Sequence, residues 1–93
     1  TKAVELSPES APAHANLGLA LMDAGDLANA EKHLMRAVDL DAAHAEAQVG
    51  LGILFARQKR FELARERWER ALELDPNLEQ ARENLRLLEQ MGF

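Results

Sequence analysis

The chain repeats itself at a spacing of 34 residues. The pair Leu17-Gly18 recurs as Leu51-Gly52, and the same interval relates Ala30 to Ala64, Ala37 to Ala71, and Leu40-Asp41 to Leu74-Asp75. Repeats of this length bury their apolar residues by stacking on their neighbours, and they form an extended surface rather than an enclosed catalytic pocket. The period therefore predicts a repeat architecture and points to binding rather than catalysis.

Apolar residues within each unit follow helical spacing. One stripe contains Leu17, Leu21 and Ala24, and the next contains Leu27, Ala30, Leu34, Ala37 and Val38. Recurrence every three to four residues is typical of an amphipathic helix. Each unit is therefore predicted to be a pair of helices. We expect helices at 11–24, 27–40, 45–58, 61–74 and 79–91, and the remnant of another at 1–6.

The turn inside each helix pair has its own chemistry. In the first unit Ala24-Gly25-Asp26 offers a glycine for the positive φ that ends a helix and an aspartate that can cap the next one. The second unit has Gln58-Lys59-Arg60 in the same positions. A residue other than glycine in a left-handed helix stop costs about 1 kcal/mol, so the second turn is expected to be the weaker one.

Composition excludes several classes of function. The net charge of −5 disfavours nucleic acid as a partner, since binding a phosphate backbone requires clustered cations. The longest apolar runs, near 17–22 and 51–56, are far shorter than the roughly 20 residues of a membrane span. There is no cysteine, and His14, His33 and His44 lack the spacing of a zinc-binding helix. No membrane insertion, metal site, cofactor or catalytic residue is therefore expected.

These positions resemble the signature of the tetratricopeptide repeat family. The second unit supplies Leu51-Gly52, Phe55, Ala64, Trp68, Ala71 and Pro76 at the family's offsets, and the first keeps Leu17-Gly18, Ala30 and Ala37. Leu21, Leu34 and Ala42 replace the Tyr, Phe and Pro of the signature in the first unit. The resemblance implies an all-α fold, a right-handed solenoid of antiparallel helix pairs.

The resemblance also implies one domain over 1–93. It would contain the end of a preceding repeat (1–10), two full repeats (11–44 and 45–78) and a C-terminal capping helix (79–93). Arg86 occupies the position of Gly18 and Gly52, which suggests that no second helix presses on it. At the other end we expect an open edge around Leu17, Leu21 and Leu34, which a homodimer of this fragment could cover.

In this family the first helix of each pair lines a concave groove that holds a peptide. Transferred position by position, the groove residues are Ala15, Asn16, Leu19, Met22, Asp23, Val49, Ile53, Ala56, Arg57, Glu83, Asn84 and Leu87. Leu19, Ile53 and Leu87 share one position of the repeat and predict an aliphatic row on the surface. Such rows are typical of surfaces that bind an apolar segment.

A subgroup of the family grips chaperone C-terminal carboxylates with Lys, Arg and Asn. Ala15 and Leu19 occupy two of those positions here and cannot pair with a carboxylate, so a clamp of this kind is not expected. The predicted function is a non-enzymatic interaction module that binds a short, partly apolar peptide segment. The alternative is self-association or internal packing in a larger protein, which could include regulation of a catalytic domain outside this fragment.

Overall fold

The computed structural model describes residues 10–92 as five α-helices. They are α2 (Ala11–Asp23), α3 (Leu27–Leu40), α4 (Ala45–Arg57), α5 (Phe61–Leu74) and α6 (Glu79–Gln90), and the described residues contain no strand. Each helix lies within one residue of its predicted bounds. The helix predicted at 1–6 lies outside the described residues.

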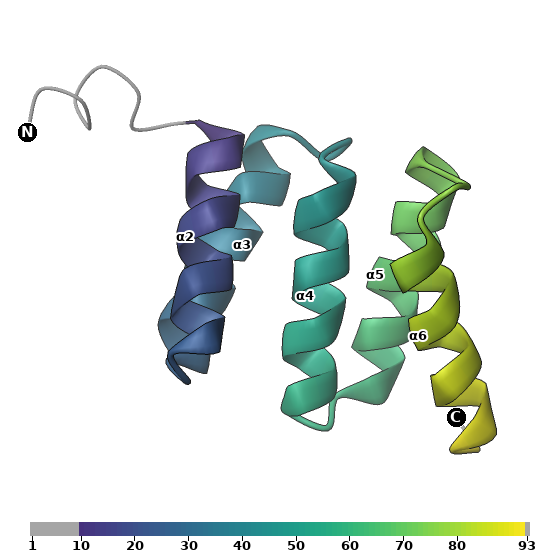
Figure 1. Ribbon diagram of the computed structural model, residues 1–93. Helices are drawn as coiled ribbons and strands as arrows, with labels where there is room; N and C mark the ends of the chain where they lie inside the picture. The colour runs from purple at the N-terminus through teal and green to yellow at the C-terminus, as the bar shows by residue number, and fades with distance from the viewer. Residues whose placement is uncertain (1–9, 93) are drawn as a thin grey trace, which may run out of the picture.

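The helices stack as antiparallel pairs in two layers. Helix α2 packs on α3 and α4 on α5, while α4 also contacts α3 and α6 contacts α5. Figure 1 shows α2, α4 and α6 on the side nearer the viewer, and we call them the front layer; α3 and α5 behind them form the back layer. The fold is the predicted all-α repeat solenoid.

Helices α2 and α3 begin and end where local chemistry requires. Ser10 caps α2 by accepting a hydrogen bond from the backbone N–H of Ala13 at 3.3 Å. Gly25 follows α2 with φ of 89°, and Asp26 then caps α3 by accepting from the backbone N–H of Asn29 at 3.3 Å. The predicted roles of Gly25 and Asp26 are therefore confirmed.

The turn between α4 and α5 uses the same geometry with less suitable residues. Lys59 has φ of 62°, the left-handed conformation that its position in the repeat predicts. Arg60 at the N-cap of α5 makes no side-chain capping hydrogen bond. Its guanidinium instead lies 4.8 Å above the ring of Phe55 and 3.5 Å from the carboxylate of Glu31, which joins this turn to the first repeat.

The recurring small residues lie where the two helices of a pair cross. A Cβ added to Gly18 would lie 2.7 Å from Cγ of Leu34, and one added to Gly52 would overlap the indole of Trp68. Trp68 is buried, and its Nε1 donates to the backbone carbonyl of Val49 at 3.3 Å. Glycine at these sites lets a large side chain from the back layer reach the front-layer backbone.

Fewer of the leucines predicted at the open edge of the first repeat are exposed than the sequence suggests. Leu17 is 45% exposed, whereas its counterpart Leu51 is fully buried. Leu21 is partly buried. The expectation for Leu34 was wrong, because this side chain is fully buried between the glycines of two front-layer helices, Gly18 and Gly50.

Candidate functional site

The predicted aliphatic row runs across the front layer, with one member on each helix. Leu87 on α6 is 52% exposed. Leu19 on α2 and Ile53 on α4 are only partly buried and pack against the edge of the core. Three aliphatic side chains at one position of the repeat thus reach the surface from three successive front-layer helices.

The other predicted groove residues divide by exposure. The exposed ones are Asn16, Asp23, Arg57 and Glu83, and the partly buried ones are Ala56 and Asn84. Ala15, Met22 and Val49 are core residues with at most 6% exposure, because other helices pack over them. The expectation that these three face a groove is corrected: they support the surface from beneath.

Asparagine recurs at one position of α2 and α6, but α4 has glycine there. A Cβ on Gly50 would lie 2.9 Å from Cδ2 of Leu19 and 3.3 Å from Cδ2 of Leu34. No side chain fits that space without a shift of both leucines. The close approach of α2 to α4 is therefore the reason why Asn16 and Asn84 have no equivalent between them.

Asn84 carries an unsatisfied polar atom. Its Nδ2 is buried and has no hydrogen-bond partner among residues 10–92. Leaving a buried donor unsatisfied costs about 1–3 kcal/mol. An acceptor that reached this amide would therefore be bound favourably. The exposed Leu87 lies three residues further along the same helix.

Two arginines of the front layer bind backbone carbonyls of earlier segments. Arg57 Nη1 donates to the carbonyl of Met22 at 3.1 Å, where the end of α2 leaves carbonyls without helical partners. Arg82 Nη2 donates to the carbonyl of Pro76 at 2.6 Å. Each arginine ties its front-layer helix to an earlier segment of the chain, and Arg57 joins one repeat to the next.

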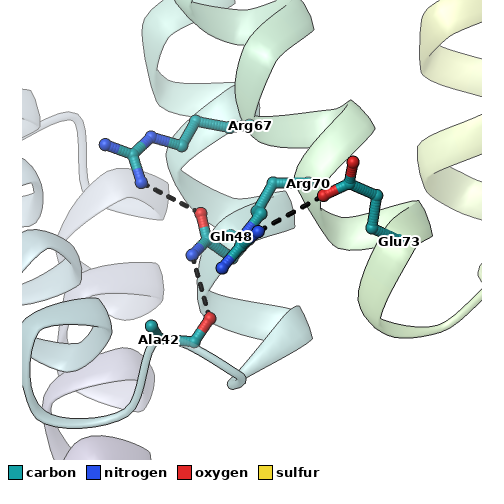
Figure 2. Close-up of polar contacts among 5 residues, drawn as sticks. All are labelled: Ala42, Gln48, Arg67, Arg70 and Glu73. Atoms are coloured by element: carbon teal, nitrogen blue, oxygen red, sulfur yellow. Dashed lines mark hydrogen bonds and ion pairs between the residues drawn. The ribbon is translucent and has the colours of Figure 1, made fainter.

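A polar cluster joins the front and back layers around Gln48 of α4, the one buried polar side chain in the described core (Figure 2). Gln48 Nε2 donates to the carbonyl of Ala42 at 3.2 Å, and its Oε1 accepts from Arg67 Nη1 at 3.0 Å. Arg70 pairs with Glu73 at 3.3 Å on the same helix as Arg67. A surface hollow of about 380 Å³ is lined by Ala42, Gln48, Arg67 and Arg70, together with acidic Asp39 and Glu66 and the apolar residues Met35 and Val38.

The first repeat places two histidines at the positions that Gln48 and Arg67 hold in the second. A hydrogen bond of 3.1 Å joins Nδ1 of His14 on α2 to Nδ1 of His33 on α3. Spacing along a single helix could not reveal this pair. The available signal was the repeat itself, because 14 and 33 become 48 and 67 on adding one period.

The described residues contain neither a group of three or more metal-ligand side chains nor a membrane span. Among residues 10–92, no three histidine, cysteine, aspartate or glutamate side chains are placed to hold a metal ion together. None of the five described helices combines the length and apolar character needed to cross a membrane.

Comparison with solved structures identifies proteins of the same architecture. The first TPR of Spaghetti (RPAP3) bound to the HSP90 peptide SRMEEVD is 28% identical with a TM-score of 0.89, over 98% of this chain and 72% of that one. The first TPR domain of human RPAP3 is 29% identical with a TM-score of 0.89, over 97% and 71%. YrrB, a TPR protein with an unusual peptide-binding site, is 26% identical with a TM-score of 0.83, over 91% and 44%.

The sequence profile of the family agrees with the structural comparison. The comparison with curated proteins found no match. The profile described as tetratricopeptide repeat matches residues 1–43 and 15–79, which together span most of the sequence. With the 34-residue period and the stacked helix pairs, this match shows that the chain belongs to the tetratricopeptide repeat family, whose fold is a scaffold for protein–protein interaction.

Proposed function

We propose that the front layer binds a short, partly apolar peptide segment of another protein, without catalysing a reaction on it. The observation that carries this proposal is the aliphatic row of Leu19, Ile53 and Leu87, which reaches the surface on three successive helices. Burying the exposed half of a leucine side chain is worth on the order of 1 kcal/mol. A row of three offers an extended segment repeated anchoring points.

Polar groups flank the row and suit the main chain of such a segment. Asn16 and Glu83 are exposed on the same layer, and Asn84 has a buried amide nitrogen with no acceptor. A peptide carbonyl is the commonest acceptor that a bound segment brings. A rotation of the Asn84 side chain would let its amide donate to that carbonyl, which would remove the cost of the unsatisfied donor.

The partner we propose differs from an acidic chaperone tail. Ala15 is fully buried and Leu19 is aliphatic, so neither can hold a carboxylate. Arg57 is already bonded to the carbonyl of Met22. The first TPR of RPAP3 has been solved with an HSP90 peptide. In this chain the front-layer residues favour a segment anchored by apolar side chains.

A displayed library of random linear peptides tests this function directly. We expect enriched peptides with spaced apolar residues, and we expect Leu87→Asp to weaken their binding at least tenfold because it places a charge in the row. Leu63→Asp is the matched control, since Leu63 is an exposed leucine of the back layer. Selected peptides that bind Leu87→Asp as well as wild type, with both variants helical by circular dichroism, would contradict the proposal.

A second candidate function rests on one face of α2. Ala13, Leu17 and Ala20 are exposed there, whereas the equivalent residues of α4 (Ala47, Leu51 and Leu54) are fully buried. This face can pack on another helix, so we propose it as the surface through which the chain would self-associate. Light scattering over a concentration series tests it: a dimer that Leu17→Glu dissociates supports self-association, and a monomer at all concentrations excludes it.

A further inference from the structure

We propose that His14 and His33 form a two-imidazole site for a divalent first-row transition metal ion such as Zn²⁺. The two rings come from different helices of the first pair and lie with their Nδ1 atoms 3.1 Å apart. The ring centroids are 5.3 Å apart and the planes differ by 21°. The centroid separation exceeds the nitrogen separation by about the width of one ring, so the two Nδ1 atoms lie on facing edges.

This separation suits two ligands of one ion. Two Zn–N bonds of about 2.05 Å that meet at about 98° span 3.1 Å, between the square-planar and tetrahedral angles. Each lone pair would have to point roughly 40° away from the line that joins the two Nδ1 atoms in order to aim at the ion. Both histidines are partly exposed, so water can complete the coordination shell.

The backbone brings these two positions together whatever residues occupy them. In the second repeat the same positions hold Gln48 and Arg67, whose side chains are in contact at 3.0 Å. The packing of the helix pair therefore places these two positions in contact in both repeats. Holding the two imidazoles close should need little rearrangement of α2 and α3. Neutral imidazole is the commonest protein ligand of Zn²⁺, Cu²⁺ and Ni²⁺, and preorganised ligands bind more tightly.

The second repeat also supplies a conservative variant. His14→Gln with His33→Arg copies the pair that this fold already accommodates, so the helices should persist while both metal ligands are lost. His44 is the third histidine and caps α4, with Nδ1 accepting from the backbone N–H of Ala47 at 3.2 Å. His44→Asn keeps a capping side chain and serves as the control for a histidine outside the site.

Calorimetric titration of the chain with Zn²⁺ alone, near neutral pH, tests the proposal. Wild type and His44→Asn should each bind one Zn²⁺ per chain with the same affinity. The double variant and each single variant should bind at least tenfold more weakly, because a chelate needs both rings. Nitrogen-15 spectra of the histidine rings should show the Nδ1 resonances of His14 and His33 shifting together with added Zn²⁺.

Three results would overturn the site. One is no Zn²⁺ binding by wild type at millimolar ion, and another is equal binding by wild type and the double variant, which would assign the ion to surface carboxylates. The third is Zn²⁺ binding by either single variant with the affinity of wild type, which would show that the two histidines do not chelate one ion together. Circular dichroism of each variant confirms that the helices are intact.

Discussion

Lys59 shows at the level of one residue what the repeat demands of its turns. The position needs positive φ, which the first repeat meets with Gly25 and the second with Lys59. Since glycine has no Cβ to strain in this conformation, Lys59→Gly should raise the free energy of unfolding by about 1 kcal/mol. Urea denaturation measures the change. Gly25→Lys is the reciprocal control and should lower stability by a similar amount; if both variants match wild type, the turns are not strained.

Asp26 makes the first turn sensitive to acid. The side-chain amide of Asn29 donates to Asp26 at 2.8 Å and its backbone N–H donates at 3.3 Å, and these bonds lower the pKa of Asp26 below its ordinary value of 3.8. Because the folded-state pKa is the lower one, the stabilisation is present above the ordinary value and is lost as pH falls through the folded-state pKa.

Asp26→Asn keeps a capping side chain that does not titrate. Its stability relative to wild type should therefore improve as the pH is lowered from about 6 to about 3. Urea midpoints of both proteins at the two pH values check this. A difference between the two proteins that does not change with pH would show that the charge of Asp26 has no part in the cap.

The two packed glycines should differ in their tolerance of a methyl group. A Cβ at Gly52 would overlap several atoms of the rigid indole of Trp68, whereas one at Gly18 would overlap less, with Cγ of Leu34 at 2.7 Å. Overpacking typically costs about 1–3 kcal/mol. Gly52→Ala should thus destabilise the fold by at least about 1 kcal/mol more than Gly18→Ala, as measured by thermal denaturation. Equal losses would contradict the packing described for Trp68.

At the scale of the element, α6 combines a stabilising core face with an unsatisfied amide. Ala81 and Leu88 are buried against the second repeat, while Asn84 between them has no partner for its buried Nδ2. Replacing an unsatisfied donor with an apolar group removes its desolvation cost, so Asn84→Leu should raise the free energy of unfolding by about 1 kcal/mol. The same variant should weaken the binding of peptides selected from the library if the Asn84 amide donates to their main chain. A loss of stability would show that Asn84 is already satisfied.

The helices were predictable from the sequence because each signal for them is local. Apolar periodicity located α2 to α6 within one residue, and the turn residues Gly25 and Lys59 marked the stops that the structure shows. The family signature then supplied the order of stacking. A period of 34 residues with recurring glycine and alanine leaves few other ways for the chain to bury its apolar residues.

What could not be predicted depends on contacts between helices. Burial of Ala15, Met22 and Val49 follows from how closely the helices pack, which a repeat position does not encode. Contact between His14 and His33 joins residues on two helices, so reading each helix separately missed it. Leu34 was misjudged because its cover comes from Gly18 and Gly50, within its own repeat and in the next one.

At the scale of the whole molecule, the back layer supports the packing of the fold and the front layer presents the proposed binding surface. The back layer holds Trp68 and Leu34 against the front-layer glycines, and Arg67 of α5 donates a hydrogen bond to Gln48 of α4. The exposed side of the front layer carries the aliphatic row and the polar residues that flank it, Asn16, Glu83 and Asn84. This division follows from stacking alone, and it is why we assign binding to α2, α4 and α6.

The most direct test of that assignment is a nitrogen-15 NMR titration of the chain with a peptide selected from the library. We expect shifts concentrated at amides of the front layer, with Leu19, Ile53 and Leu87 among the most affected, and small shifts across α3 and α5. Leu87→Asp should abolish these shifts and Leu63→Asp should preserve them. Shifts concentrated on the back layer, or unchanged in Leu87→Asp, would contradict the claim that the aliphatic row is the binding surface.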